Sequence, residues 1–237
     1  IGTEGAAPVL ATRLRAQLEQ DLDPGLGRLA DIARTLRAEV FYKNYAQLVR
    51  EFTGEAPGST GRFDATPNRY PWGRVDNSGS GYAQGFDVFF RDQKTIKNGD
   101  YWLTYSYLDS KRLFQNYLAE ATPTFASTHN LSAIYKQFLT KISTSLSATY
   151  TYTSGRPYYN PNNPVFLADR TPAVHNVSLS AAYLTRLKGN FLVIYATLDN
   201  LLNTRNVFTY RYSADGQTRY AIGPANYRSF FIGCSLS

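Results

Sequence analysis

Residues 142–153 have the sequence ISTSLSATYTYT, and this stretch decides the fold. Along it, apolar and aromatic residues such as Leu146 and Tyr150 alternate with small hydroxyl residues such as Ser147 and Thr149. Successive side chains of a β-strand point to opposite faces. The pattern therefore predicts a strand with one apolar face and one polar face.

The same alternation recurs along the chain and predicts about nine strands. We expect them at Thr12–Gln20, Arg34–Gln47, Gly81–Asp92, Asp100–Leu108, Asn130–Leu139, Ile142–Thr153, Asn176–Leu187, Asn190–Asp199 and Tyr227–Leu236. The first segment also fits a helix over Ala11 to Leu22, because Leu10, Leu14 and Leu18 form a helical stripe.

The connections between these segments alternate between long and short. The short ones carry turn residues, with Asn98-Gly99 in one and Lys188-Gly189 as a two-residue hairpin. The long ones are rich in proline and glycine, for example Pro157 and Pro161 in one loop. Outer-membrane barrels have short periplasmic turns and long extracellular loops. The alternation therefore predicts an all-β, antiparallel transmembrane β-barrel whose last strand ends on the periplasmic side.

Composition agrees with a barrel wall. Aromatic residues make up 15% of the chain and charged residues only 18%, against roughly 25% in soluble domains. The longest apolar run, Phe191 to Leu198, is far shorter than the ~20 residues of a spanning helix. If the chain crosses a membrane, it must do so with strands.

Aromatic residues fall into two bands. One band lies near the long loops and the other near the short turns, as in the aromatic girdles of a barrel. The first comprises Tyr105, Tyr107, Tyr150, Tyr152 and Tyr227, and the second Phe90, Tyr101, Tyr135, Tyr183 and Phe191. The alternative is that tyrosine and phenylalanine are simply good strand formers.

The sequence also repeats itself. The run from Thr104 to Tyr107 recurs from Thr149 to Tyr152, and the run from Thr128 to Ser132 recurs from Val174 to Ser178. Each repeat spans two strands and one long loop, as an up-and-down barrel requires.

Little in the sequence points to catalysis, metal binding or nucleic-acid binding. His129 and His175 each open a strand with no carboxylate or cysteine at ligand spacing, so we expect interface residues rather than a metal or acid/base pair. Cys234 is the single cysteine, and no zinc or phosphate-loop signature is present. The net charge of +7 comes from scattered residues. It fits charged polar loops, contact with anionic lipid headgroups or a basic lumen that attracts anionic solutes better than nucleic-acid binding. We expect no enzyme activity and no cofactor.

The C-terminal third resembles a known family. The stretch from Thr197 to Asn203 is similar to the end of the penultimate strand of TonB-dependent outer-membrane receptors, and residues 206–213 continue as in their Bacteroidetes type. Residues 228–237 resemble the family's last strand, although the usual terminal aromatic residue is missing. Residues 36–45 and 81–88 also resemble strands of these receptors.

The resemblance implies that residues 1–237 are the C-terminal portion of a larger receptor barrel in the bacterial outer membrane. Nothing in the chain resembles the plug domain, through which such receptors contact TonB. The family takes up scarce nutrients, namely siderophores, cobalamin, oligosaccharides or peptides. Outer-membrane lipid and lipopolysaccharide are the expected surroundings, and a surface lipoprotein is an expected partner in part of the family.

Two other functions stay open at this point. The chain could be a complete small barrel that acts as a passive pore, an adhesin or a rim enzyme, or a soluble all-β binding domain. The soluble domain leaves the alternation of loop lengths unexplained.

Two sets of residues are candidates for solute contact. Long loops place aromatic rings beside arginines, a combination that binds sugars, aromatic chelators and anions, or simply packs the loops. This set is Tyr70, Trp72, Arg74, Arg156, Tyr158 and Tyr159. Inward-facing charges are the second set, as a lining of the solute path or as contacts of a plug. They are Arg13, Arg15, Arg37, Glu39, Lys43 and Asp87.

Overall fold

The computed structural model describes residues 35–52, residue 63 and residues 74–237. These residues form ten strands and one short 3₁₀ turn. The strands are β1 (Leu36–Phe52), β2 (Arg74–Asp92), β3 (Gly99–Leu113), β4 (His129–Leu139), β5 (Thr144–Thr153), β6 (Val174–Leu187), β7 (Asn190–Asp199), β8 (Thr209–Tyr212), β9 (Arg219–Ile222) and β10 (Ser229–Leu236). Within these residues, no helix is long and apolar enough to cross a membrane.

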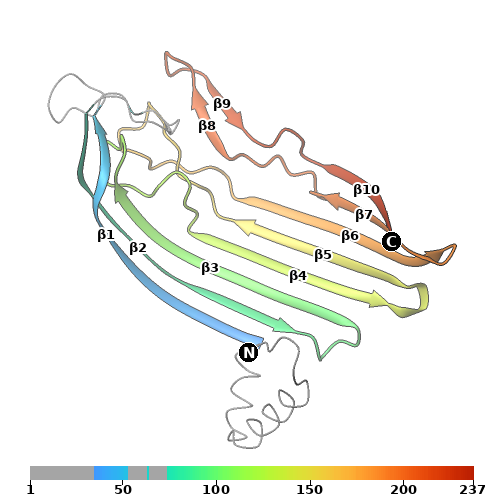
Figure 1. Cartoon of the computed structure of the whole chain (residues 1–237). Helices are drawn as coiled ribbons and strands as arrows, with labels where there is room; N and C mark the ends of the chain where they lie inside the picture. Colours follow the sequence, from blue (N-terminus) through green and yellow to red (C-terminus); the bar gives the residue numbers. More distant parts are fainter. Residues whose placement is uncertain (1–34, 53–62, 64–73) are drawn as a thin grey trace, which may run out of the picture.

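Eight of the strands form one antiparallel sheet in the order β1-β2-β3-β4-β5-β6-β7-β10. Figure 1 shows this sheet as a curved wall, with the long connections at one end and the short turns at the other. The C-terminus lies on the short-turn side, where Ser237 and Phe191 exchange backbone hydrogen bonds of 2.9 and 3.0 Å. The sheet is open, with β1 and β10 at its edges. The predicted partial barrel wall is therefore confirmed.

Eight of the nine predicted segments correspond to the strands of this wall, although the second begins at Arg34, just outside the described residues. The segment predicted at Thr12–Gln20 lies wholly outside them. The strand predicted from Ile142 begins only at Thr144, because Thr140–Ile142 form a 3₁₀ turn and Ser143 has a φ of +48°. The strand predicted from Gly81 begins earlier, at Arg74, which pairs with Phe52 of β1. The register of this pairing shifts at Gln47, which has a φ of +57°.

Strands β8 and β9 were not predicted. They pair only with each other and form a hairpin within the last long connection, above the β7–β10 pair in Figure 1. Each has four residues, which is too short for an alternation pattern to stand out.

The register assigns every strand residue to one of two faces, because directly paired residues of neighbouring strands lie on the same face. One face is apolar and exposed, and Val40 on it is 84% exposed. We call it the outer face; across the sheet it carries Phe90, Leu103, Ala133, Tyr150, Val177, Leu179 and Ile232. The opposite, inner face is rich in hydroxyl and amide groups and includes Thr104, Ser132, Thr151 and Asn176.

The two-residue turn between β6 and β7 is the one the sequence predicts. Lys188 and Gly189 have φ values of +51° and +90°. Two positive φ values define the type I′ turn, whose twist matches that of the strands it joins. Glycine takes the second position because no Cβ then opposes this backbone conformation.

The buried hydrophobic cluster lies in the loops rather than in the sheet. It consists of Phe63, Tyr117, Ala121 and Leu167, and Phe114, Tyr159 and Phe166 pack against it. These residues come from three successive long connections, so the loops form a packed tier above the wall.

Candidate binding surfaces of the loops and the inner wall

Aromatic rings hold the loop tier together. Phe63 lies edge-on to Tyr117 and Phe166, with ring centroids 5.7 and 5.0 Å apart. Tyr117 is 3% exposed, and burial raises the pKa of its hydroxyl group. That hydroxyl oxygen accepts a hydrogen bond of 3.1 Å from the backbone N–H of Thr124. The cluster therefore brings Phe63 together with the β3–β4 and β5–β6 loops.

Tyr158 and Tyr159 are neighbours in the sequence but make different contacts. Tyr159 packs on Phe63 within the cluster, with ring centroids 5.1 Å apart. Tyr158 is 5% exposed and lies against Tyr210 of β8, at a centroid distance of 4.8 Å. Both rings are engaged in loop packing, and a role of theirs in binding stays a prediction.

Arg219 of β9 connects the hairpin to the same loop. Its guanidinium group donates a 3.3 Å hydrogen bond to the Tyr158 hydroxyl and lies 4.2 Å from the centre of the Tyr210 ring. The hydrogen bond to Tyr158 raises the pKa of Arg219. This contact joins the β8–β9 hairpin, which lies outside the eight-stranded sheet, to the loop that carries Tyr158.

Arg156 differs from the two tyrosines because it borders an open space. Its Nε donates a 3.2 Å hydrogen bond to Ser127 Oγ, which links two loops. It also lines a hollow of about 360 Å³ between the inner wall and the loops. The other lining residues are Thr153, Ser154, Thr171, Val174, Val207 and Phe208. Sequence reasoning missed these six, since no local pattern distinguishes them from other loop and strand residues.

The remaining loop candidates lie elsewhere. Arg74 forms an ion pair of 3.5 Å with Asp76, and its guanidinium group lies 5.4 Å from the centre of the Phe52 ring. Tyr70 and Trp72 lie outside the described residues.

Four of the inward-facing candidates are on the inner face. Glu39 pairs with Asp87 across β1 and β2, and Lys43 pairs with Ala83. The Arg37 guanidinium group lies 5.9 Å from the centre of the Phe89 ring, its partner on β2. These four residues lie on the inner face, as predicted. Their role in a solute path stays a prediction. Arg13 and Arg15 lie outside the described residues.

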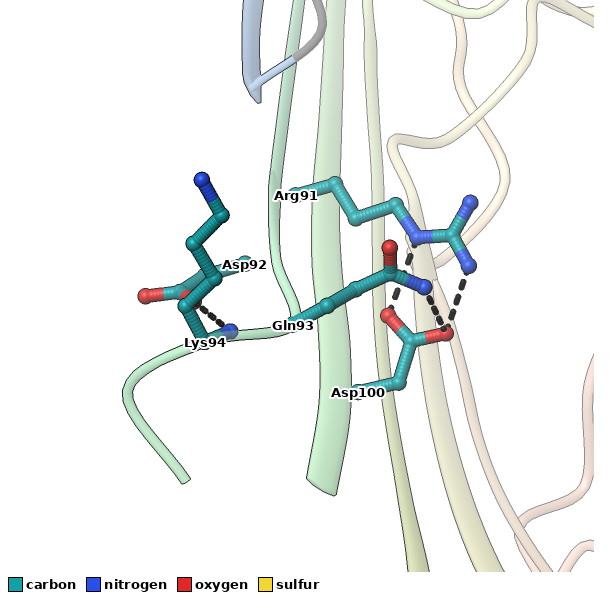
Figure 2. Close-up of polar contacts among 5 residues, drawn as sticks. All are labelled: Arg91, Asp92, Gln93, Lys94 and Asp100. Atoms are coloured by element: carbon teal, nitrogen blue, oxygen red, sulfur yellow. Dashed lines mark hydrogen bonds and ion pairs between the residues drawn. The ribbon is translucent and has the colours of Figure 1, made fainter. Parts of the chain in front are cut away.

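A polar cluster marks the short-turn end of the inner face (Figure 2). Arg91 donates two hydrogen bonds to the Asp100 carboxylate, of 2.9 Å from Nε and 2.6 Å from a terminal nitrogen, and Gln93 donates a third of 3.1 Å. Asp92 lies on the other side of the strand and accepts a 2.7 Å hydrogen bond from the backbone N–H of Lys94. An open polar hollow of about 620 Å³ borders the cluster and is also lined by Arg37.

The two histidines lie on different strands, and each is hydrogen-bonded to a tyrosine. His129 pairs with Tyr107 and His175 with Tyr152 on the outer face. Tyr105 is hydrogen-bonded to His129 Nδ1 at 2.8 Å, and Tyr150 to His175 Nδ1 at 3.0 Å. Within the described residues, no group of three or more His, Cys, Asp or Glu side chains could hold a metal ion. The sequence repeat thus corresponds to a repeated tyrosine–histidine arrangement in one aromatic band.

Comparisons with known proteins give the fold a context. No family model and no curated protein matches the sequence. The chain is similar to the solved structure of the ferric-catecholate import receptor Fiu from Escherichia coli, with a TM-score of 0.55 and 13% identity, over 84% of this chain and 24% of that one. It is also similar to the outer membrane transporter YddB from Escherichia coli, with a TM-score of 0.57 and 13% identity, over 84% of this chain and 30% of that one.

At this identity the likeness shows the fold alone, which is that of part of the barrel wall of such outer-membrane proteins. The chain spans less than a third of the length of either structure. The fold is that of proteins of the bacterial outer membrane, the location that the sequence predicts.

Proposed function

We propose that this chain is the C-terminal part of the barrel of a TonB-dependent receptor for active nutrient uptake in the bacterial outer membrane. The observation that carries the proposal is the match of 84% of the chain to two outer-membrane transport proteins. The motifs from Thr197 to Asn203 and at residues 228–237 support it independently, because they resemble that family in sequence.

The open sheet supports a larger barrel. Within the described residues, β1 and β10 each have one neighbour, so one side of each strand leaves backbone N–H and C=O groups unpaired. Hydrocarbon provides no partner for such groups, and each would cost several kcal/mol in a bilayer. Further strands would satisfy them, as in the transporters that the chain resembles.

The inner wall suits a polar solute. Hydroxyl groups line it, and Arg156 lies between this wall and the loop tier, where an anionic or oxygen-rich solute would meet it. A siderophore, cobalamin, an oligosaccharide or a peptide would each meet these requirements; the name of Fiu makes ferric catecholates the first to test. Energy would come from TonB through a plug domain, and this chain would perform no catalysis. Lipopolysaccharide would surround the wall, and a Bacteroidetes-type receptor would add a surface lipoprotein over the loops.

The test measures uptake by cells that express the full-length gene. Cells lacking the gene and cells carrying it receive a ferric catecholate labelled with radioactive iron, and cobalamin, in parallel, with and without TonB. We expect gene-dependent uptake of a solute that stops when TonB is removed. Uptake that persists without TonB would overturn the proposal in favour of a passive pore.

Two arginine variants test whether the solute passes through the hollow that Arg156 lines. Arg156→Ala removes a charged group from the hollow under the loops, and we expect half-saturation at about tenfold higher solute concentration. Arg170→Ala is the matched control, because Arg170 lies in the same loop and contacts the Gly155 carbonyl oxygen instead of the hollow. Equal effects of the two variants would mean that the hollow is not on the path.

A further inference from the structure

The short turns form a cationic rim. Lys97 lies in the turn between β2 and β3, Lys141 between β4 and β5, and Lys188 between β6 and β7, and all three are exposed. None of these turns contains an acidic residue. The nearest carboxylates are already engaged, since Asp100 pairs with Arg91 and Asp92 accepts hydrogen bonds from its own turn. Asp92 keeps its negative charge on the outer face beside Tyr101, because its hydrogen bonds come from neutral donors. The three lysines therefore give the rim an excess of positive charge over this one carboxylate.

The first of these turns is held firmly. Gly99 donates a 2.9 Å backbone hydrogen bond to Ile96, and Phe138 of β4 donates one of 2.9 Å to Asn98. The side-chain amide of Gln137 donates a further bond of 3.0 Å to the Lys97 carbonyl oxygen. Lys97 is thus presented from a fixed backbone, directly beside β4.

An apolar hollow of about 600 Å³ opens on the outer face next to this rim. It begins at Ile96, in the same turn as Lys97, and continues toward the middle of the sheet. Its outer-face lining residues include Phe90, Tyr101, Leu103, Ala133, Tyr135 and Ala148. Small-molecule sites in proteins have volumes of ≈ 300–1,000 Å³, so the hollow is large enough to hold part of a ligand.

We propose that this hollow and the lysines of the β2–β3 and β4–β5 turns, Lys97 and Lys141, bind an anionic glycerophospholipid. An acyl chain lies along the hollow between Tyr101, Tyr135 and Tyr150, and the headgroup phosphate lies at the lysine rim. The occupant is a bilayer lipid because the hollow is open to the outer face and lined by apolar groups. It is an anionic lipid because the lysines of the rim, Lys97, Lys141 and Lys188, outnumber the carboxylate of Asp92 there.

The other end of the outer face differs. There Lys111 and Asp109 both lie on the outer face of β3, and Asp109 accepts a hydrogen bond of 3.0 Å from Gln84. On β3 at this end, one lysine lies near one carboxylate, with no excess of positive charge between them, and Lys111 provides the matched control. The inference rests on the membrane placement in the proposed function but does not depend on transport.

The experiment uses the full-length receptor, purified in detergent and exposed to nanodiscs of phosphatidylethanolamine with or without phosphatidylglycerol. Native mass spectrometry then counts the phospholipids that the receptor retains. The variants are Lys97→Gln with Lys141→Gln to remove charge, Ala133→Phe to fill the hollow, and Lys111→Gln as control. Folding of each variant is checked by its heat-dependent migration in gels, and uptake is measured in the same strains.

We expect the wild type and Lys111→Gln to retain phosphatidylglycerol in preference to phosphatidylethanolamine. The double lysine variant should lose about twentyfold in affinity, from about fivefold for each lysine near an anionic surface. Ala133→Phe should lose the lipid while remaining folded. Retention of phosphatidylglycerol by either folded variant, equal loss in Lys111→Gln, or lipopolysaccharide as the retained lipid would each overturn the proposal. Lipid loss with unchanged uptake would leave the proposed transport function intact.

Discussion

The wall and the loop tier of this chain are stabilised in opposite ways. In the loops, Tyr117 and Leu167 are buried, and rings pack as they do in a soluble core. In the wall, large apolar side chains such as Val40 and Leu179 stay exposed, and among the described residues no second sheet packs on either face. The loops therefore depend on contacts within the protein, whereas the outer face of the wall depends on lipid. The comparison shows that one chain can suit both water and lipid: its loops bury their apolar residues within the protein, and its strands expose theirs to lipid.

The largest expected effect tests the loop tier. Tyr117→Ala removes a ring that touches Phe63, Phe114 and Phe166, and replacing a buried aromatic residue by alanine costs about 3–5 kcal/mol. We expect this loss to be local, so that proteolysis of the loops accelerates while the wall stays folded. Limited proteolysis of the receptor in liposomes measures both. Unfolding of the whole wall would show that the two regions are not independent.

The next effect tests the wall. Leu179→Arg places a charge on the outer face between the two aromatic bands, at a cost of about 2–4 kcal/mol near the middle of a bilayer. The neighbouring Ser180→Arg is the control, because Ser180 pairs with Ser147 on the inner face and its side chain meets water. Denaturant unfolding in liposomes should separate the two variants. Equal stability would mean that the outer face does not contact lipid.

The smallest effect lies in the β8–β9 hairpin. The Asp215 carboxylate accepts hydrogen bonds from the Ser213 hydroxyl and the backbone N–H of Gln217, and these bonds lower its pKa. A lowered folded-state pKa means that the turn is stabilised above the ordinary value of about 3.9 and loses this support as pH falls through the lowered pKa. The protection of the Gln217 amide, measured as its exchange rate relative to the intrinsic rate at each pH, should therefore fall with pH in this acid range. Asp215→Ala should remove this fall. An unchanged profile in the variant would contradict this assignment.

The wall could be predicted from the sequence because the physics of a strand is local. Residues 142–153 alternate between Leu146 or Tyr150 and Ser147 or Thr149, and the two faces of β5 follow from that alone. The same holds for the turn at Lys188 and Gly189, where the residue types dictate the backbone.

The candidate sites could not be predicted as fully, because loop contacts join distant residues. No sequence pattern indicates that the Tyr158 ring packs against Tyr210 or that the Tyr159 ring packs against Phe63. Nor does it tell that Arg219 fixes the hairpin, since its partner Tyr158 lies in another loop. The ion pair of Arg91 and Asp100 lies between these two cases. It cannot be seen in the local sequence, but it follows once the register of β2 and β3 is known.

The repeated tyrosine–histidine arrangement has a consequence for the evolution of such walls. His129 with Tyr105, and His175 with Tyr150, occupy equivalent positions two strands apart. A hairpin with its loop is thus an interchangeable unit, and a duplicated copy would meet its neighbours in the same register and at the same depth in the bilayer. Barrels can then widen by gene duplication in steps of two strands, which agrees with the even strand numbers of bacterial barrels.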